Sequence, residues 1–315
     1  MTELALSQPK RVQDLWFADG DVVLQAEDHI FRVRSKVLAE QSSELEKWLG
    51  LQKPDDAKTI EDCPVLLFRD TPEDLGHFLK AIFDPSCSFW SKLPVPPALS
   101  VTAAVLRLST KYEVAHLRRR ALKHMALFSP LTLHELDSRS FNMLGNTDLI
   151  LRLNIAIEFN LTWAMPLVMY WIICSLGYMD LRDSLRPPLQ HDCIFARAWL
   201  AAAQKDAVFQ FLRTPKISEA CTTSWDCLCQ RLATYERAKI FVINPLACTL
   251  DDHVPGLASE GRKKEWEAVC EACRAEGMIR HQNARHSIWS KLPEVFHLPS
   301  WVDLQAARAA DLKEE

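Results

Sequence analysis

Glycine is scarce in this chain of 315 residues, which contains only eight. Their positions allow neither the G-x-G-x-x-G pattern of dinucleotide-binding domains nor the G-x-x-x-x-G-K-[ST] loop that cradles nucleotide phosphates. The G-x-S-x-G elbow of many hydrolases and the H-E-x-x-H motif of zinc proteases are absent as well. Because no catalytic motif can be drawn, we expect a protein that is not an enzyme.

An excess of basic charge is also missing. Lys and Arg number 37 against 41 Asp and Glu, and the isoelectric point is near 6.2. Proteins bind nucleic-acid backbones mainly through many Lys and Arg contacts that release counterions. We therefore expect no direct nucleic-acid partner.

Signals for secretion or membrane insertion are lacking too. The start, MTELALSQPKR, has no cationic stretch followed by an apolar core. Residues 159–179 carry no charge, but Asn160, Pro166 and Gly177 lower the apolar character of this stretch. Its dense apolar part, 167–176, has about half the length needed to span a membrane. We expect a buried helix there, no membrane association, and a cytoplasmic or nuclear location. In such a reducing compartment the ten cysteines would be free or metal-bound.

Apolar residues, in contrast, are plentiful. Hydrophobic residues make up 48% of the chain, which includes 10 Trp and 14 Phe, so the chain has ample material for a buried core. Its length exceeds the roughly 100 to 200 residues of one ordinary domain. Two domains are therefore expected, with boundaries at 14–128 and 129–315.

The first of these domains has the pattern of a small sheet with helices. Residues 21–27 and 30–34 are rich in β-branched and alternating apolar residues and predict a hairpin. Short helices are expected over 36–41 and 42–51, and a third strand over 64–69. Thr71-Pro72, with two acids behind it, predicts the start of a helix that runs to about Phe83. After a charged loop at 55–62 and a proline-rich loop at 84–97, the remaining predicted helices centre on Val101–Tyr112 and Leu117–Phe128.

Three segments of this domain carry a resemblance to a known family. They are DVVLQAEDHIFRVRSKVLAEQSSELEKWL, PVLLFRDTPEDLGHFLKAIFD and LRLSTKYEVAHLRRRALKHM. Together they resemble a BTB/POZ domain over residues 14–128, and more narrowly the BTB-domain proteins of basidiomycete fungi. The resemblance continues in Cys221, Cys227, Cys270 and Cys273 and in the ending IWSKLPEVFHLPSWVDL (Ile288–Leu304). It implies an α+β fold, in which a BTB/POZ-like domain with a short sheet and helices is followed by an all-α C-terminal domain.

The resemblance also implies a function in protein interaction. BTB domains bind proteins and commonly dimerise, so we expect a protein partner and a homodimer. Three large apolar residues before the hairpin, Leu15, Trp16 and Phe17, are candidates for the self-association surface. Asp21 matches an acid that lies in a charged pocket at the interface of dimeric members. Ser35 stands in place of the usual basic partner, which Arg34 or Lys36 would then supply.

A second function remains open from the same resemblance. Some BTB proteins are substrate adaptors of cullin ubiquitin ligases. Leu45 replaces the usual Phe after Ser42, and the φ-x-E arrangement of cullin-binding members is missing. These departures favour an interaction protein, with the cullin adaptor as the alternative.

The cysteines of the helical C-terminal domain carry its main chemical signal. Cys221 and Cys227 form a C-x5-C pair before a helix, and Cys270 and Cys273 form a C-x2-C pair on one helical face. Four thiolates close tetrahedrally around zinc in structural sites, so these four residues are candidate ligands. The sequence leaves two alternatives open, inert buried thiols and a redox dithiol. Residues that could substitute as ligands are Cys174, Cys229, Cys248 and His253.

Stripes of apolar residues at helical spacing predict the helices of this domain. The predicted buried stripes are Leu149, Leu153, Ile157 and Leu161; Ile194, Ala198 and Ala201 with Phe195 and Trp199; and Leu228, Leu232 and Tyr235.

Overall fold

The computed structural model describes residues 9–51, 59–92, 94–138, 145–237, 243–247 and 266–313. The chain divides into two compact units. The N-terminal unit contains the residues up to Phe128 together with those from Ala310 on, and the C-terminal unit contains Ser129–Ala309. The predicted boundary after residue 128 agrees with this division. The last residues, which were expected in the helical domain, belong instead to the N-terminal unit.

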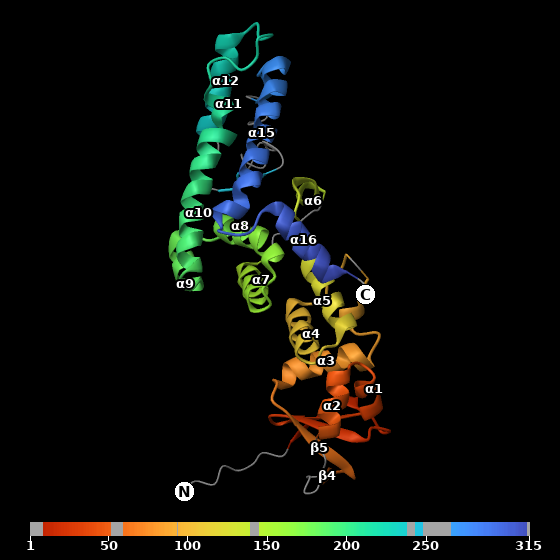
Figure 1. Ribbon diagram of the computed structural model, residues 1–315. Coiled ribbons are helices and arrows are strands. Elements are labelled where there is room, and N and C mark those ends of the chain that lie inside the picture. The colour runs from red at the N-terminus through yellow and green to blue at the C-terminus, as the bar shows by residue number, and fades with distance from the viewer. Residues whose placement is uncertain are drawn as a thin grey trace, which may run out of the picture. The chain divides into compact units, whose positions relative to one another are not determined.

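A five-stranded sheet with the strand order β1-β3-β2-β5-β4 underlies the N-terminal unit (Figure 1). The predicted hairpin is confirmed, since β2 and β3 pair antiparallel and the turn between them places Glu27 at φ 48°. Strand β1 pairs with β3, and β2 pairs with β5, both in parallel. The bounds of the strands are β1 (Lys10–Trp16), β2 (Val22–Ala26), β3 (His29–Val33), β4 (Thr59–Ile60) and β5 (Cys63–Phe68).

Strands β1 and β4, at the two edges of the sheet, are missing from the predicted elements. β1 is polar and largely exposed, with Leu15 as its only fully buried residue, so its residues do not alternate as those of a half-buried strand do. β4 is only two residues long, and it falls within the stretch 55–62 that was expected to be a charged loop. The N-terminal domain therefore begins before the predicted residue 14.

The helices of the N-terminal unit begin and end close to the predicted positions. Thr71 caps α3 by accepting a hydrogen bond from the Asp74 N–H at 3.2 Å, with Pro72 in the first turn. Leu24, Phe31, Leu45, Leu75 and Phe78 form part of the core, each no more than 1% exposed. The helices are α1 (Ser35–Ala39), α2 (Ser43–Leu51), α3 (Pro72–Phe83), η1 (Ser88–Trp90), α4 (Leu99–Lys111) and α5 (Ala115–Ala126).

A buried histidine in α5 makes the stability of this unit sensitive to acid. His124 is 2% exposed, and its Nε2 lies 3.0 Å from the Phe89 carbonyl oxygen. Burial lowers the pKa of His124 below its ordinary value of 6.5, and the nearby Arg120 lowers it further, against the hydrogen bond to Phe89. The unfolded chain therefore takes up this proton first, so the stability is complete above about pH 6.5 and falls as the pH drops below it.

We expect the wild-type protein to lose free energy of unfolding between pH 7 and pH 5 more steeply than His124→Gln. The difference in slope is at most about 1.4 kcal/mol per pH unit, the value for one proton. Urea unfolding followed by circular dichroism at several pH values measures it. His297→Gln, a change at an exposed histidine, serves as the control and should keep the wild-type slope. Identical slopes for wild type and His124→Gln would contradict the prediction.

The described part of the C-terminal unit consists of helices and the loops between them, with no strand. Helix α10 continues through a π-helical turn, η3, and α15 contacts α10, η3 and α11 (Figure 1). The elements are α6 (Leu133–Asp137), α7 (Asn146–Glu158), η2 (Thr162–Ala164), α8 (Met165–Ser175), α9 (Tyr178–Ser184), α10 (Leu189–Ala203), η3 (Gln204–Val208), α11 (Gln210–Arg213), α12 (Ser224–Arg237), α15 (Glu271–Val295) and most of α16 (Trp301–Leu312).

The predicted helices exist, but each of the three predicted buried stripes is partly wrong. In α7, Leu149 and Leu153 are buried as predicted, whereas Ile157 is 49% exposed. In α10 the buried face holds smaller residues, and Phe195 is 64% exposed. In α12, Leu232 is 37% exposed. The buried residues are Cys193, Ala196 and Leu200 in α10, and Cys227, Arg231 and Thr234 in α12.

The uncharged stretch 159–179 contains the 11-residue helix α8, most of whose side chains are buried in the core of this unit. In the part of the chain that the structure describes, no helix combines the length and the apolar character needed to cross a membrane.

The ending Ile288–Leu304 forms the last turns of α15 and the start of α16. The rings of Trp289 and Trp301 stack face to face, with centroids 4.4 Å apart. The Trp301 Nε1–H also donates a hydrogen bond to the Trp289 carbonyl oxygen at 2.7 Å. This aromatic pair fixes the turn between the two helices.

Candidate functional site

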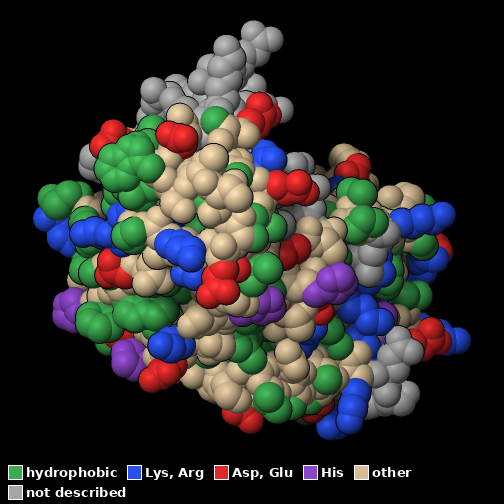
Figure 2. Space-filling view, turned by 90° about the horizontal axis from the view of Figure 1, so that it is seen from above, with side chains coloured by type: hydrophobic (Ala, Val, Ile, Leu, Met, Phe, Trp, Pro, Cys, Tyr) green, Lys and Arg blue, Asp and Glu red, His purple; other side chains and the backbone are tan. Residues whose placement is uncertain are grey.

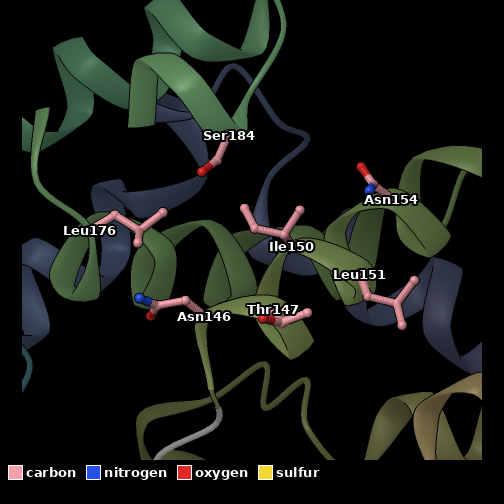
Figure 3. A pocket seen from close by; sticks show the side chains of 7 residues that line it. All are labelled: Asn146, Thr147, Ile150, Leu151, Asn154, Leu176 and Ser184. Carbon is pink, nitrogen blue, oxygen red and sulfur yellow. The ribbon is translucent and has the colours of Figure 1, made fainter. Parts of the chain in front are cut away.

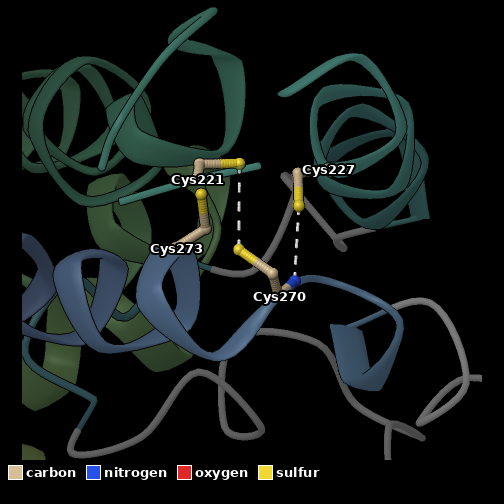
Figure 4. A group of neighbouring side chains, drawn as sticks. All are labelled: Cys221, Cys227, Cys270 and Cys273. Carbon is tan, nitrogen blue, oxygen red and sulfur yellow. Dashed lines mark hydrogen bonds between the residues drawn. The ribbon is translucent and has the colours of Figure 1, made fainter. Parts of the chain in front are cut away.

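The four predicted cysteines meet at one end of the C-terminal unit (Figure 4). Cys221 lies in the segment before α12, and Cys227 lies in the first turn of that helix. Cys270 is the residue immediately before α15, and Cys273 lies in the first turn of α15. Three segments of the chain thus contribute sulfurs, and Figure 4 shows these directed toward one another.

The backbone at Cys270 and Cys273 differs from the prediction in one respect. Cys270 has φ −57° and ψ 152°, so it is the N-cap of α15 and lies outside the helix. The two sulfurs are therefore not brought together by sharing one helical face. They meet because an N-cap side chain folds back over the first turn of its helix, in which Cys273 lies.

The distances between the sulfurs suit a tetrahedral metal ion. All four Sγ atoms lie within 4.8 Å of one another, and those of Cys221 and Cys270 are 3.8 Å apart. Zinc binds thiolates at about 2.3 Å, so the edge of a regular tetrahedron of sulfurs is about 3.8 Å. The group is therefore able to hold a metal ion with little rearrangement.

Hydrogen bonds already stabilise negative charge within this group. The bond from the Cys273 thiol, with weaker ones from its other neighbours, lowers the pKa of Cys221 to about 7. Burial, together with hydrogen bonds with Cys221 and Cys270, raises the pKa of Cys273 to about 12. The backbone N–H of Cys270 donates to the Cys227 sulfur at 3.3 Å. One thiolate is thus accessible at neutral pH, and thiolates are the form that binds metal.

Of the substitute ligands named from the sequence, the two that the structure describes, Cys174 and Cys229, do not join the group. Cys229 is exposed on α12. Cys174 lies in α8, where burial raises the pKa of its thiol to about 12. Cys248 and His253 lie outside the described residues.

The predicted interaction residues lie in the N-terminal unit, and all but one of them are at least partly exposed. Leu15 is 1% exposed and belongs to the core, so it has no free face to offer a partner. Trp16 is half-buried under the Arg11 guanidinium, 4.5 Å from its ring centroid. Phe17 lies 5.2 Å from Phe83, measured between ring centroids.

Asp21 and Arg34, the charged pair that the resemblance implies, contact other residues and not each other. The Asp21 carboxylate accepts hydrogen bonds from the backbone N–H and the hydroxyl of Ser35, both at 2.6 Å. Arg34 pairs instead with Asp19 at 3.7 Å and stacks over Phe17, 4.9 Å from the ring centroid. Ser35, read from the sequence as the loss of a basic partner, is itself the partner of Asp21.

A shallow hollow of about 480 Å³ lies beside α7 (Figure 3). Its described lining consists of Asn146, Thr147, Ile150, Leu151, Asn154, Leu176 and Ser184. None of these side chains is an acid, base or thiol that titrates near neutral pH, so this lining offers no general acid or base.

Charged side chains of both signs are interspersed on the face of the molecule that Figure 2 presents. Comparisons of the chain with protein-family models, with curated proteins and with solved structures find no significant match.

Proposed function

We propose that the chain is a non-enzymatic protein-interaction protein. In this proposal the N-terminal unit is a BTB/POZ-like domain that self-associates. The helical C-terminal unit is closed by a structural zinc ion and presents a surface to a second protein. The observation that carries the metal-binding part of the proposal is the meeting of four cysteine sulfurs within 4.8 Å in the helical unit.

The number of ligands favours a structural metal over a catalytic one. A catalytic zinc ion keeps a position open for water or substrate, whereas four protein thiolates fill the tetrahedron. Cys227 and Cys273 are each 1% exposed, so water has little access to half of the group. The residues present thus fit a metal that ties the start of α12 to the start of α15.

Self-association is supported by the resemblance of residues 14–128 and by an aromatic cluster in the N-terminal unit. Phe17, Phe83 and Arg34 pack on one another and remain partly exposed. Trp16, next along the chain, is also only half-buried. Aromatic residues and arginine are the types most enriched at the centres of protein interfaces.

We expect the double variant Trp16→Ala, Phe17→Ala to contain a smaller fraction of dimer than the wild-type protein. The substitutions remove two large, partly exposed rings and leave the buried Leu15 in place. Sedimentation velocity at several protein concentrations measures the dimer fraction.

Leu67→Ala is the matched control, because Leu67 is an apolar residue of the same unit that is 64% exposed. It should dimerise as the wild type does. An unchanged mass distribution in the double variant would place the interface elsewhere. Co-purification of a cullin with the wild-type chain under native conditions would favour the adaptor alternative.

A further inference from the structure

A buried positive charge lies next to the four cysteines. Arg231, in α12, is 1% exposed and follows Cys227 by one helical turn. Its guanidinium donates hydrogen bonds only to backbone carbonyl oxygens, those of Cys227 at 3.3 Å, Phe211 at 2.7 Å, Thr214 at 2.6 Å and Pro215 at 3.0 Å.

This guanidinium has no acidic partner among the residues that the structure describes. Arg285, another fully buried arginine of this unit, differs in that its charge is neutralised by an ion pair with Asp137. Carbonyl oxygens satisfy the N–H groups of Arg231, but they are dipoles and leave its net charge uncompensated. A buried charge without a counter-charge costs several kcal/mol.

Among the described residues, the groups able to carry negative charge that act on this guanidinium are cysteines. The guanidinium interacts electrostatically with Cys273, Cys227 and Cys221. A divalent metal ion bound by four thiolates has a net charge of about −2, since each deprotonated sulfur contributes −1. The metal-loaded group would therefore supply the missing counter-charge, whereas four neutral thiols would not.

We propose that Arg231 is the counter-ion of the metal centre. Its positive charge stabilises the four metal-bound thiolates, and its hydrogen bonds hold the 211–215 segment, which leads toward Cys221, against α12. This inference rests on the proposed metal binding. According to this inference, Arg231 contributes to the affinity for the metal although it is not a ligand. Residues that surround the ligands of a metal site commonly contribute in this way.

The test compares three variants of the full chain with the wild type. Arg231→Gln keeps some hydrogen-bonding capacity and loses the charge, whereas Arg231→Lys keeps the charge and loses the planar fork. Arg182→Gln is the control, because Arg182 is exposed on α9 and paired with Asp183. Zinc affinity is measured by competition with a chromophoric chelator, and the visible spectrum of bound Co²⁺ reports the four-sulfur coordination.

We expect Arg231→Gln to bind zinc about 10 to 100 times more weakly than the wild type, the range for such supporting residues. Arg231→Lys should stay within a few-fold of the wild type, and Arg182→Gln should match it. Equal weakening in Arg231→Gln and Arg231→Lys, or none in Arg231→Gln, would overturn the inference.

Unfolding with and without a chelator separates the role of the charge from a purely structural role. Without metal the group carries less negative charge than four metal-bound thiolates do, so Arg231→Gln should cost less stability in the metal-free protein than in the metal-loaded protein. An equal loss in both states, or failure to fold in both, would show that Arg231 is only a structural clamp. If the wild-type chain binds neither zinc nor Co²⁺, the proposed metal binding itself is wrong, whatever the variants do.

Discussion

Replacing Cys273 by serine is expected to abolish zinc binding and to lower the free energy of unfolding of the C-terminal unit by about 4 kcal/mol or more. Cys273 is 1% exposed and lies in the first turn of α15, so its sulfur is the most fixed of the four together with that of Cys227. A ligand that binds only the folded state at about a thousand times its dissociation constant contributes about 4.1 kcal/mol. Wild-type protein, freshly purified and reduced, should contain about one zinc ion per chain by elemental analysis.

The exposed cysteine of α12 provides the matched control. Cys229→Ser makes the same chemical change two residues from Cys227, at a sulfur outside the group. It should keep the zinc content and the urea midpoint of the wild type. A strong chelator should lower the midpoint of the wild type and of Cys229→Ser, and should leave Cys273→Ser unchanged. A zinc content near zero in the wild type, or equal losses in both serine variants, would contradict the prediction.

The parts of the structure that the sequence predicts well depend on contacts between near neighbours in the chain. Helix α3 begins where Thr71 and Pro72 predict, because a cap and a proline act within one turn. The β2–β3 hairpin depends on alternation over a few residues. The group of four cysteines was predictable for a different reason. Each pair is close in sequence, and a tetrahedral site needs two such pairs, so few combinations of cysteines need to be considered.

The parts that were missed depend on contacts between distant residues. Strand β1 is stabilised by parallel pairing with β3, and its polar sequence does not predict this pairing. The buried face of α10 is lined by Cys193, Ala196 and Leu200, whereas the large Phe195 is exposed, so the largest residues did not mark the core. Arg231 escaped notice because a buried arginine looks in sequence like any residue of a solvated helix face.

Replacing a second buried arginine is also expected to lower the stability of the C-terminal unit strongly. Arg285 of α15 is 1% exposed, and its Nη2 lies 2.5 Å from Asp137 Oδ1 at the end of α6. Its guanidinium also donates to the Leu246 carbonyl oxygen, through Nε at 3.1 Å and Nη2 at 3.0 Å. One side chain thus joins three segments that are far apart in sequence. The sequence does not reveal this connection, because 148 positions separate the two charged residues.

We expect Arg285→Met to lower the free energy of unfolding by about 3 kcal/mol, the low end of the range for breaking a buried ion pair. The low end applies because Asp137 is 32% exposed and water can solvate its carboxylate once the partner is gone. Asp137→Asn should cost a similar amount, since it leaves the fully buried guanidinium without a counter-charge. Urea unfolding monitored by circular dichroism measures both losses.

The double variant Arg285→Met, Asp137→Asn tests whether the pair, and not the volume of either side chain, accounts for the loss. With both charges removed, neither a buried cation nor an unpaired carboxylate remains, so the double variant should be less destabilised than the sum of the single variants by at least about 1 kcal/mol. Lys291→Met, at an exposed position of the same helix, should change stability by less than about 0.5 kcal/mol. Additive losses in the double variant would mean that the two side chains stabilise the fold independently.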